Sequence, residues 1–242
     1  MKQIHIGNVK IDDLSAEEAL DFALDAKNAP CFVVTPNALM VEKCRKDPQK
    51  AELLNRASLS LADGVGIQWA ARRQGTPIRA RIAGIDFGER LLAYAAQNGL
   101  RVFLLGGGEG VAELAANRLT ARYPGLCICG TYWGYFDPFG EDDQRLISVL
   151  CATCPDVLLV CMGFPLQEEW IAEHLERLSS LQVIAGLGGS LDVWAGKLRR
   201  APRWISRIGL EWAWRIALEP RKRLSQLPLL LRFGIFGGRY LD

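Results

Sequence analysis

The sequence contains few of the residues on which several large enzyme classes depend. Only two of its 242 residues are histidines, His5 in a predicted strand and His174 in a predicted helix, which argues against a Ser-His-Asp or Cys-His nucleophile. No Asp-x-Asp pair is present to hold a divalent metal against a diphosphate, so no metal site is expected. The glycine-rich stretch 106–110 lacks the Gly-Lys-Ser/Thr of a P-loop. Triad hydrolases, metal-dependent transferases and P-loop ATPases are therefore disfavoured.

Long apolar runs are missing as well. No run reaches the ~18 to 20 residues that a membrane-spanning helix needs. The first residues also lack the apolar core of a secretory signal. The seven cysteines are odd in number and mostly lie in apolar, strand-like stretches, which favours reduced, structural thiols. These features predict a protein of the cytosolic side.

The small net charge of +2 hides an uneven distribution. Residues 197–242 contain 11 Lys/Arg and 3 Asp/Glu, a balance of +8, whereas the first 196 residues carry 18 minus 24, or −6. The basic part interleaves Lys and Arg with Trp and with the apolar run 227–231, which suits an anionic inner-leaflet lipid surface. Binding of single-stranded nucleic acid and a merely solvated charged face are the alternatives. The apolar content favours lipid, so no nucleic-acid partner is expected.

Short apolar strands alternate with helical segments up to residue 185. Ser15 and Glu18 form a capping box at the start of the first helix. The alternation predicts a Rossmann-like α/β fold, with a mostly parallel sheet covered by helices on both faces. Because the strands stop near Gly189, we expect a catalytic core at 1–195 and a basic, amphipathic, helical appendage at 196–242. Strands are expected at 31–35, 59–62, 101–105, 126–130, 156–162 and 182–185, and helices at 15–28, 38–56, 64–73, 86–97, 109–123, 141–152 and 166–178.

Asp63 is the most informative carboxylate in the chain. It directly follows a predicted strand, and Gly64 and Gly66 keep the space around it open. Ligands of an open parallel sheet bind beyond the carboxyl ends of its strands, so Asp63 is a candidate general base. The alternative is an N-cap of the next helix. Thr35 and Asn37 follow the neighbouring strand and could orient a sugar or a phosphate, with a turn and a helix cap as the alternative.

Two glycine-rich turns could allow the backbone to approach a phosphate. Gly106, Gly107 and Gly108 follow a strand and open a helix, whose N-terminus offers unpaired N–H groups. A tight turn without a ligand is equally consistent with this stretch. Gly188 and Gly189 form a second candidate cradle, for which a plain turn is the favoured interpretation.

Several short segments together resemble one known family. They cover nearly the whole chain, and their joint pattern is highly specific. On these residues the sequence resembles the WecG/TagA/CpsF glycosyltransferases of bacterial surface-polysaccharide assembly. The segments are 35–38 (TPNA), 61–66 (LADGVG), 81–84 (RIAG), 105–108 (LGGG), 134–136 (GYF), 163–168 (GFPLQE), 188–190 (GGS), 195–202 (AGKLRRAP) and 209–212 (GLEW).

The resemblance implies a Rossmann-like core with a C-terminal appendage that meets the membrane. It implies inverting, metal-independent transfer of a sugar from a UDP-sugar to a polyprenyl-diphosphate-linked saccharide, with no cofactor. The expected location is peripheral, on the cytoplasmic face of the plasma membrane. N-Acetylmannosamine, its uronic acid, glucose and glucuronic acid are the donor sugars that the family suggests. Family members can associate through the core, so a homo-oligomer is among the expected assemblies.

The resemblance also assigns roles to individual residues. Asp63 matches the position of the catalytic base, and Thr35 is taken as catalytic with it. Asn37, Arg81 and Gln167 match positions of the substrate pocket.

The appendage is expected to take part in catalysis. Its arginines would help to hold the diphosphate, and Arg215, Arg221 and Arg223 are the candidates. We further expect the appendage to fold over the active site only at the membrane.

Two alternative functions are considered. A nucleotide-dependent oxidoreductase would need an acidic residue on the second strand to hold a ribose. A non-catalytic nucleotide- or membrane-binding Rossmann-like protein is the interpretation that the tail alone would suggest.

Overall fold

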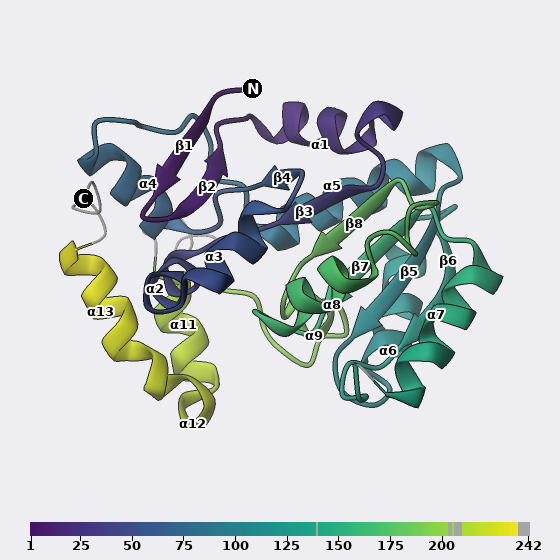
Figure 1. The fold of residues 1–242 in the computed structure, drawn as a ribbon. Helices are drawn as coiled ribbons and strands as arrows, with labels where there is room; N and C mark the ends of the chain where they lie inside the picture. Colours follow the sequence, from purple (N-terminus) through teal and green to yellow (C-terminus); the bar gives the residue numbers. More distant parts are fainter. Residues whose placement is uncertain (139, 203–204, 206–209, 237–242) are drawn as a thin grey trace.

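The centre of the molecule is a six-stranded parallel sheet. The computed structural model describes residues 1–138, 140–202, 205 and 210–236. Its strand order is β4-β3-β8-β7-β5-β6, all neighbours run parallel, and an antiparallel β1–β2 hairpin stands apart (Figure 1). The predicted α/β class is confirmed. The strands are β1 Gln3–Ile6, β2 Val9–Asp12, β3 Cys31–Val34, β4 Leu59–Ser60, β5 Arg101–Gly106, β6 Cys127–Tyr132, β7 Val157–Cys161 and β8 Val183–Gly186.

Helices cover both faces of the sheet because successive strand residues point to opposite sides. In β3, Phe32 and Val34 belong to one core cluster, whereas Cys31 and Val33 belong to the other. Helices α2, α3, α4, α7 and α8 supply the first cluster, and α1, α5, α6 and α9 supply the second. The helices are α1 Ala16–Leu24, α2 Ala38–Lys46, α3 Pro48–Asn55, α4 Val65–Arg73, α5 Gly84–Asn98, α6 Val111–Arg122, α7 Glu141–Thr153, α8 Leu166–His174, α9 Ser190–Trp194, α11 Glu211–Leu218, α12 Pro220–Arg223 and α13 Leu227–Phe236.

The first helix begins as expected but ends earlier. The capping box is present: the Ser15 hydroxyl accepts from the Glu18 N–H at 3.1 Å, and the Glu18 carboxylate accepts from the Ser15 N–H at 2.7 Å. The helix stops at Leu24 because Asp25 has an extended backbone and caps a separate 3₁₀ turn, Ala26–Asn28. The prediction of one helix to residue 28 was therefore wrong in its last turn.

His174 has a structural role in the packing of two helices. Its ring is buried between α7 and α8, with Nε2 2.9 Å from the Asp143 carboxylate. The same carboxylate accepts from the Trp170 indole N–H at 2.6 Å. Asp143 thus serves as a buried acceptor inside the helical layer.

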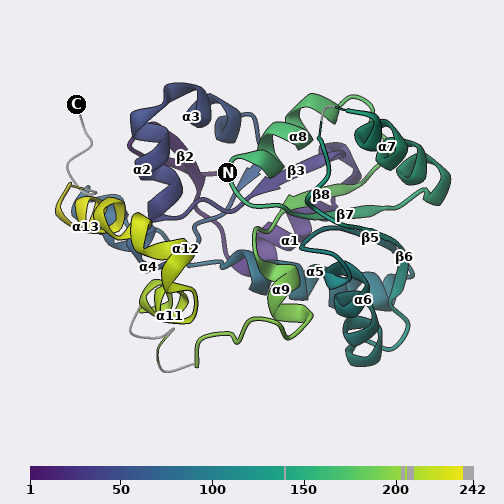
Figure 2. The same ribbon diagram turned by 90° about the horizontal axis from the view of Figure 1, so that it is seen from below.

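The basic end of the chain packs beside one edge of the core. Helices α11, α12 and α13 lie next to α2 and α4, on the opposite side of the molecule from β5 and β6 (Figure 2). Phe233 of α13 is 3% exposed and joins the core cluster of α2 and α4. Gly209, at the start of one family-like segment, lies outside the described residues. In the part of the chain that the structure describes, no helix combines the length and apolarity needed to cross a membrane.

Candidate active site

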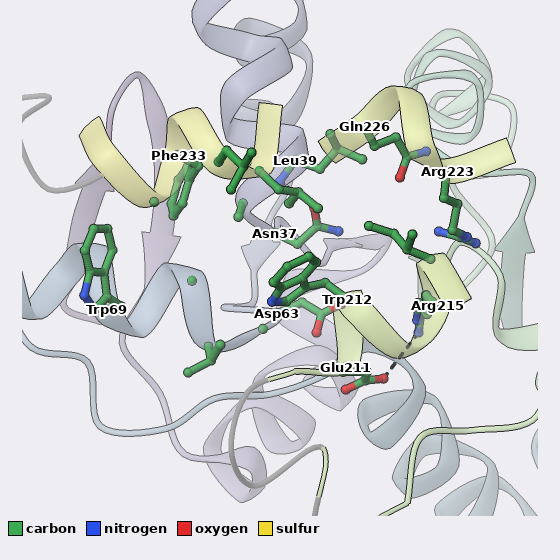
Figure 3. Close-up of a pocket in the computed structure, with 18 of the residues that line it drawn as sticks. Asn37, Leu39, Asp63, Trp69, Glu211, Trp212, Arg215, Arg223, Gln226 and Phe233 are labelled. Atoms are coloured by element: carbon green, nitrogen blue, oxygen red, sulfur yellow. Dashed lines mark hydrogen bonds and ion pairs between the residues drawn. The ribbon is translucent and has the colours of Figure 1, made fainter. Parts of the chain in front are cut away.

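The ends of β3 and β4 place Asp63 at the base of a pocket. Beyond the short β4, the Leu61 N–H donates to the Val34 carbonyl at 2.9 Å, and the Asp63 N–H donates to the Pro36 carbonyl at 3.0 Å. Gly64 then occupies the N-cap position of α4 with a φ of +88°, a conformation that favours glycine. No side chain caps α4. The N-cap alternative for Asp63 is therefore wrong, and its carboxylate faces the pocket (Figure 3).

The surroundings of Asp63 tune it as a base. Burial raises the pKa of this carboxyl to about 6; the guanidinium of Arg215 opposes the rise, and the carboxylate of Glu211 adds to it. A general base works best when its pKa lies near the operating pH. At neutral pH Asp63 is mostly ionised and still basic enough to accept a proton.

The pocket has a volume of about 590 Å³ and is formed jointly by the core and the basic tail. Such a volume is typical of small-molecule sites. Its two ends differ in character, with Trp69 and Phe233 at one end, Glu211, Arg215 and Arg223 at the other, and Asp63, Asn37 and Trp212 between them (Figure 3). The site therefore combines a carboxylate, a cationic end and an apolar end.

Positive charge reaches the pocket from both the core and the tail. Arg81 of the core and Arg215 of α11 share one counter-ion, since Glu211 lies 3.9 Å from the first and 3.5 Å from the second. Arg223 contacts Glu219 at 2.8 Å and also lines the pocket. The geometry thus separates the predicted tail arginines: Arg215 and Arg223 line the pocket, whereas Arg221 is exposed on α12 and does not.

Asn37 both caps a helix and lines the pocket. Its side-chain oxygen caps α2 by accepting from the N–H groups of Leu39 and Met40, each at 3.1 Å. The same residue lines the pocket beside Asp63. Because the cap fixes the side chain, the amide is held in one orientation toward a ligand.

Thr35 and Gln167 are buried and do not line the pocket. The Thr35 hydroxyl donates to the Gly186 carbonyl at 3.3 Å. The Gln167 carbonyl oxygen accepts from the N–H groups of Gly163 at 3.1 Å and Gly188 at 3.0 Å. These bonds connect the carboxyl ends of β3, β7 and β8. The catalytic role of Thr35 and the binding role of Gln167 stay predictions.

The first glycine-rich turn lies away from Asp63. Strands β8 and β7 stand between β3 and β5, and Gly106, Gly107 and Gly108 are not among the pocket residues. Packing accounts for two of them, because a Cβ at Gly106 would collide with the Cys161 carbonyl, and one at Gly107 would lie 2.7 Å from Val111. Phosphate binding at this turn stays a prediction.

The second glycine-rich turn lies closer to the tail. Gly189 lines a small cavity that shares Arg215 and Arg223 with the main pocket and adds Arg199 and Arg200. Gly188 donates to Gln167, as described above. This turn therefore shares a cavity with cationic side chains.

The apolar wall and the acidic residue of the pocket were not predicted from the sequence. Val65 and Trp69 line the pocket together from α4. Their i, i+4 spacing, which places side chains on one helical face, was the available signal. Glu211 was noticed only as part of the 209–212 segment. Its ion pair with Arg215 is a local i, i+4 pair of α11, whereas its contact with Arg81 depends on how α11 docks on the core, which no local pattern shows.

Glu168 is a second perturbed carboxyl that the sequence did not single out. It is completely buried, and its Oε1 accepts from the Gln167 side-chain amide at 2.8 Å. Its Oε2 has no hydrogen-bond partner among the described residues. Burial raises the pKa of Glu168 to about 8, so the side chain is mainly protonated at neutral pH.

The substitution Glu168→Gln is expected to stabilise the protein increasingly as the pH rises from about 5 to 8. The unfolded chain loses this proton near pH 4.3, whereas the folded protein keeps it to about pH 8, so the free energy of unfolding falls with pH over that window. Glutamine has no proton to lose and keeps an acceptor for Gln167. Melting temperatures of both proteins at pH 5, 6.5 and 8 provide the measurement; a constant difference across these pH values would contradict the assignment.

Comparison with known proteins gives this geometry a context. A sequence model of the glycosyl transferase WecG/TagA/CpsF family matches residues 4–236. Two similar proteins are the N-acetylglucosaminyldiphosphoundecaprenol N-acetyl-beta-D-mannosaminyltransferases of Staphylococcus aureus strains MRSA252 and NCTC 8325 / PS 47. Each is 36% identical over 202 residues, which cover 83% of this chain and 78% of the relative. The chain, with its carboxylate and arginines around one pocket, therefore belongs to the WecG/TagA/CpsF family and is a glycosyltransferase.

Proposed function

We propose that this enzyme transfers a sugar from a UDP-sugar to a saccharide linked to a polyprenyl diphosphate, with inversion at the anomeric carbon. The observation that carries the proposal is a carboxylate with a pKa of about 6 in a pocket that is cationic at one end and apolar at the other. The names of the Staphylococcus aureus relatives specify an N-acetylglucosaminyl diphosphoundecaprenol acceptor and a β-linked product. A β-linked product from an α-linked UDP-sugar requires one inversion.

Asp63 acts as the base of a single displacement. Its carboxylate takes the proton of an acceptor hydroxyl while that oxygen forms a bond to the anomeric carbon of the donor. The bond between this carbon and the UDP oxygen breaks on the opposite side, and its electron pair leaves with UDP. Because the attack and the departure take place on opposite faces, the configuration inverts.

Arginines stabilise the diphosphate in place of a metal ion. Arg81, Arg215 and Arg223 all line the pocket that contains Asp63. Fixed cationic groups aimed at developing negative charge are an effective form of transition-state stabilisation. The proposed mechanism therefore includes neither a metal nor another cofactor. As the diphosphate enters, each arginine gives up its ion pair with a carboxylate of the protein and contacts the diphosphate instead.

The tail brings the enzyme to its lipid-linked acceptor. Apolar side chains of the tail stay exposed beside basic ones, with Leu218 of α11 41% exposed and Leu224 56% exposed. Such surfaces bind anionic bilayers in the plane of the headgroups. We place the enzyme peripherally on the cytoplasmic face of the plasma membrane. In the structure the tail already lies over the pocket, and the dependence of this closure on a membrane is part of the proposal.

A panel of UDP-sugars tests the proposed function. UDP release is measured with a polyprenyl-diphosphate N-acetylglucosamine acceptor, with and without EDTA. We expect acceptor-dependent release from one donor, N-acetylmannosamine first because the relatives transfer it, with its uronic acid, glucose and glucuronic acid as the other candidates. Release without acceptor, or none from any donor in the presence of lipid, would contradict the proposal.

The substitution Glu211→Gln is expected to move the acidic limb of the pH–rate profile to lower pH. The Glu211 carboxylate raises the pKa of Asp63, and it also contacts Arg81 and Arg215, which lower that pKa. Removal of the Glu211 charge lowers the pKa of Asp63 directly, and it also frees Arg81 and Arg215 to lower that pKa further. The measurement is kcat/KM between pH 4.5 and 8. An unchanged or higher apparent pKa would show that Asp63 does not govern the limb.

A further inference from the structure

The apolar end of the pocket is a groove between two helices. Val65 and Trp69 form its wall on α4, and Leu231 and Ile235 form its wall on α13. In each pair the residues are four apart, so each helix presents one apolar stripe to the groove. The groove therefore extends the pocket away from Arg215 and Arg223, to the end at which Trp69 and Phe233 lie (Figure 3).

The side chains of this groove are apolar and yet exposed. Leu231 is 57% exposed, Ile235 59% and Val65 39%. Contiguous exposed apolar side chains beside a pocket mark a binding surface, since their contact with water is unfavourable. Their arrangement on two facing helices suits an elongated apolar ligand better than a flat one.

The groove is a built feature because α13 is anchored on the core. The Phe233 ring is buried against α4, where a Cβ at Gly66 would lie 3.3 Å from the ring and 3.0 Å from Ala38. Arg232 reaches Glu42 of α2 at 3.9 Å. These contacts fix one face of α13 on the core, so that Leu231 and Ile235 face the groove.

We propose that this α4–α13 groove binds the first isoprenoid units of the polyprenyl-diphosphate acceptor. The proposal rests on the proposed function and assigns the lipid part of the substrate a place on the protein. In such an acceptor the diphosphate is followed directly by an apolar chain. The pocket has the same order of chemistry, with cationic side chains near Asp63 and the apolar groove next to them. The enzyme would thus draw the start of the chain out of the bilayer instead of binding the head group alone.

Binding of farnesyl diphosphate tests the groove without sugar transfer. This probe carries a diphosphate and three isoprenoid units, and its affinity is measured by calorimetry in the absence of lipid. We expect Val65→Ser and Leu231→Ser each to weaken binding about tenfold, as the loss of one buried aliphatic contact predicts. Leu224→Ser is the matched control, because Leu224 is apolar, 56% exposed and in the same tail, but outside the pocket lining. Melting temperatures establish that all three variants are folded.

The outcomes separate the groove from a general membrane-binding surface. Equal weakening by Leu231→Ser and Leu224→Ser, or unchanged affinity in both groove variants, would overturn the proposal and assign these side chains to the bilayer. A wild-type protein that does not bind farnesyl diphosphate would also overturn it. If binding behaves as expected but no UDP-sugar is used, the proposed function fails while the isoprenoid diphosphate site stands.

Discussion

Replacement of Asp63 by asparagine is expected to lower kcat by a factor of about 10² to 10⁴, the usual contribution of a general base. Asparagine keeps the size and polarity of the side chain, so donor binding should change little. It cannot accept the proton of the acceptor hydroxyl, and the loss therefore appears in kcat. In the wild type, kcat/KM should rise with pH up to about 6 and then level off, because the ionised form of Asp63 is the active one.

The same substitution should stabilise the fold at neutral pH. The pKa of Asp63 is about 6 in the folded protein and near 3.9 in an unfolded chain, so ionisation costs up to roughly 3 kcal/mol above pH 6. Asparagine removes this cost, and the melting temperature should rise at pH 7.5 but not at pH 4. An inactive variant that is also destabilised at pH 7.5 would indicate a structural defect and leave the role of Asp63 without support.

Loss of Arg215 or Arg223 is the other change with a large expected effect. Both side chains line the pocket from the tail, where they can stabilise negative charge on the diphosphate. Removal of one such group typically costs about 10² to 10³ in rate. We expect Arg215→Ala and Arg223→Ala each to reduce kcat/KM for the lipid-linked acceptor by this factor. Arg223→Lys should recover part of the loss, because a positive charge returns.

Arg221→Ala is the control for both arginine variants. Arg221 lies two residues from Arg223, carries the same charge and points outside the pocket lining. Its loss weakens attraction to anionic vesicles by about 1 kcal/mol, as it would for any surface arginine of the tail. Steady-state kinetics over a range of concentrations of a detergent-solubilised acceptor give kcat/KM without that contribution. Equal losses in Arg221→Ala and Arg223→Ala would mean that the arginines act only through general charge.

The strand-end residues were predictable because the relevant geometry is local. Adjacent parallel strands end at the same edge, so Asn37 after β3 and Asp63 after β4 had to lie close together. Arg81 joins them directly from the stretch before α5. The position of the Gly106 turn was harder to predict, because the insertion of β8 and β7 between β3 and β5 depends on pairing between distant segments.

The tail shows the other limit of sequence reasoning. Its charge excess was visible, but the direction of each arginine depends on how α11 and α12 dock on the core. Only the fold shows that Arg215 faces Asp63 and that Arg221 does not. Glu168 was missed for a related reason, since a lone glutamate is normally exposed and its complete burial follows from tertiary packing.

The configuration of the linkage formed in the reaction tests whether the enzyme inverts the anomeric carbon without a metal ion. The enzyme is incubated with the UDP-sugar that it uses, a polyprenyl-diphosphate N-acetylglucosamine acceptor and excess EDTA, and the product is analysed by NMR. We expect a β-linked disaccharide on the lipid diphosphate, formed at the same rate as without EDTA and about 10²- to 10⁴-fold more slowly when Asp63→Asn replaces the wild type. An α-linked product, or a product that forms only after a divalent metal is added, would contradict it.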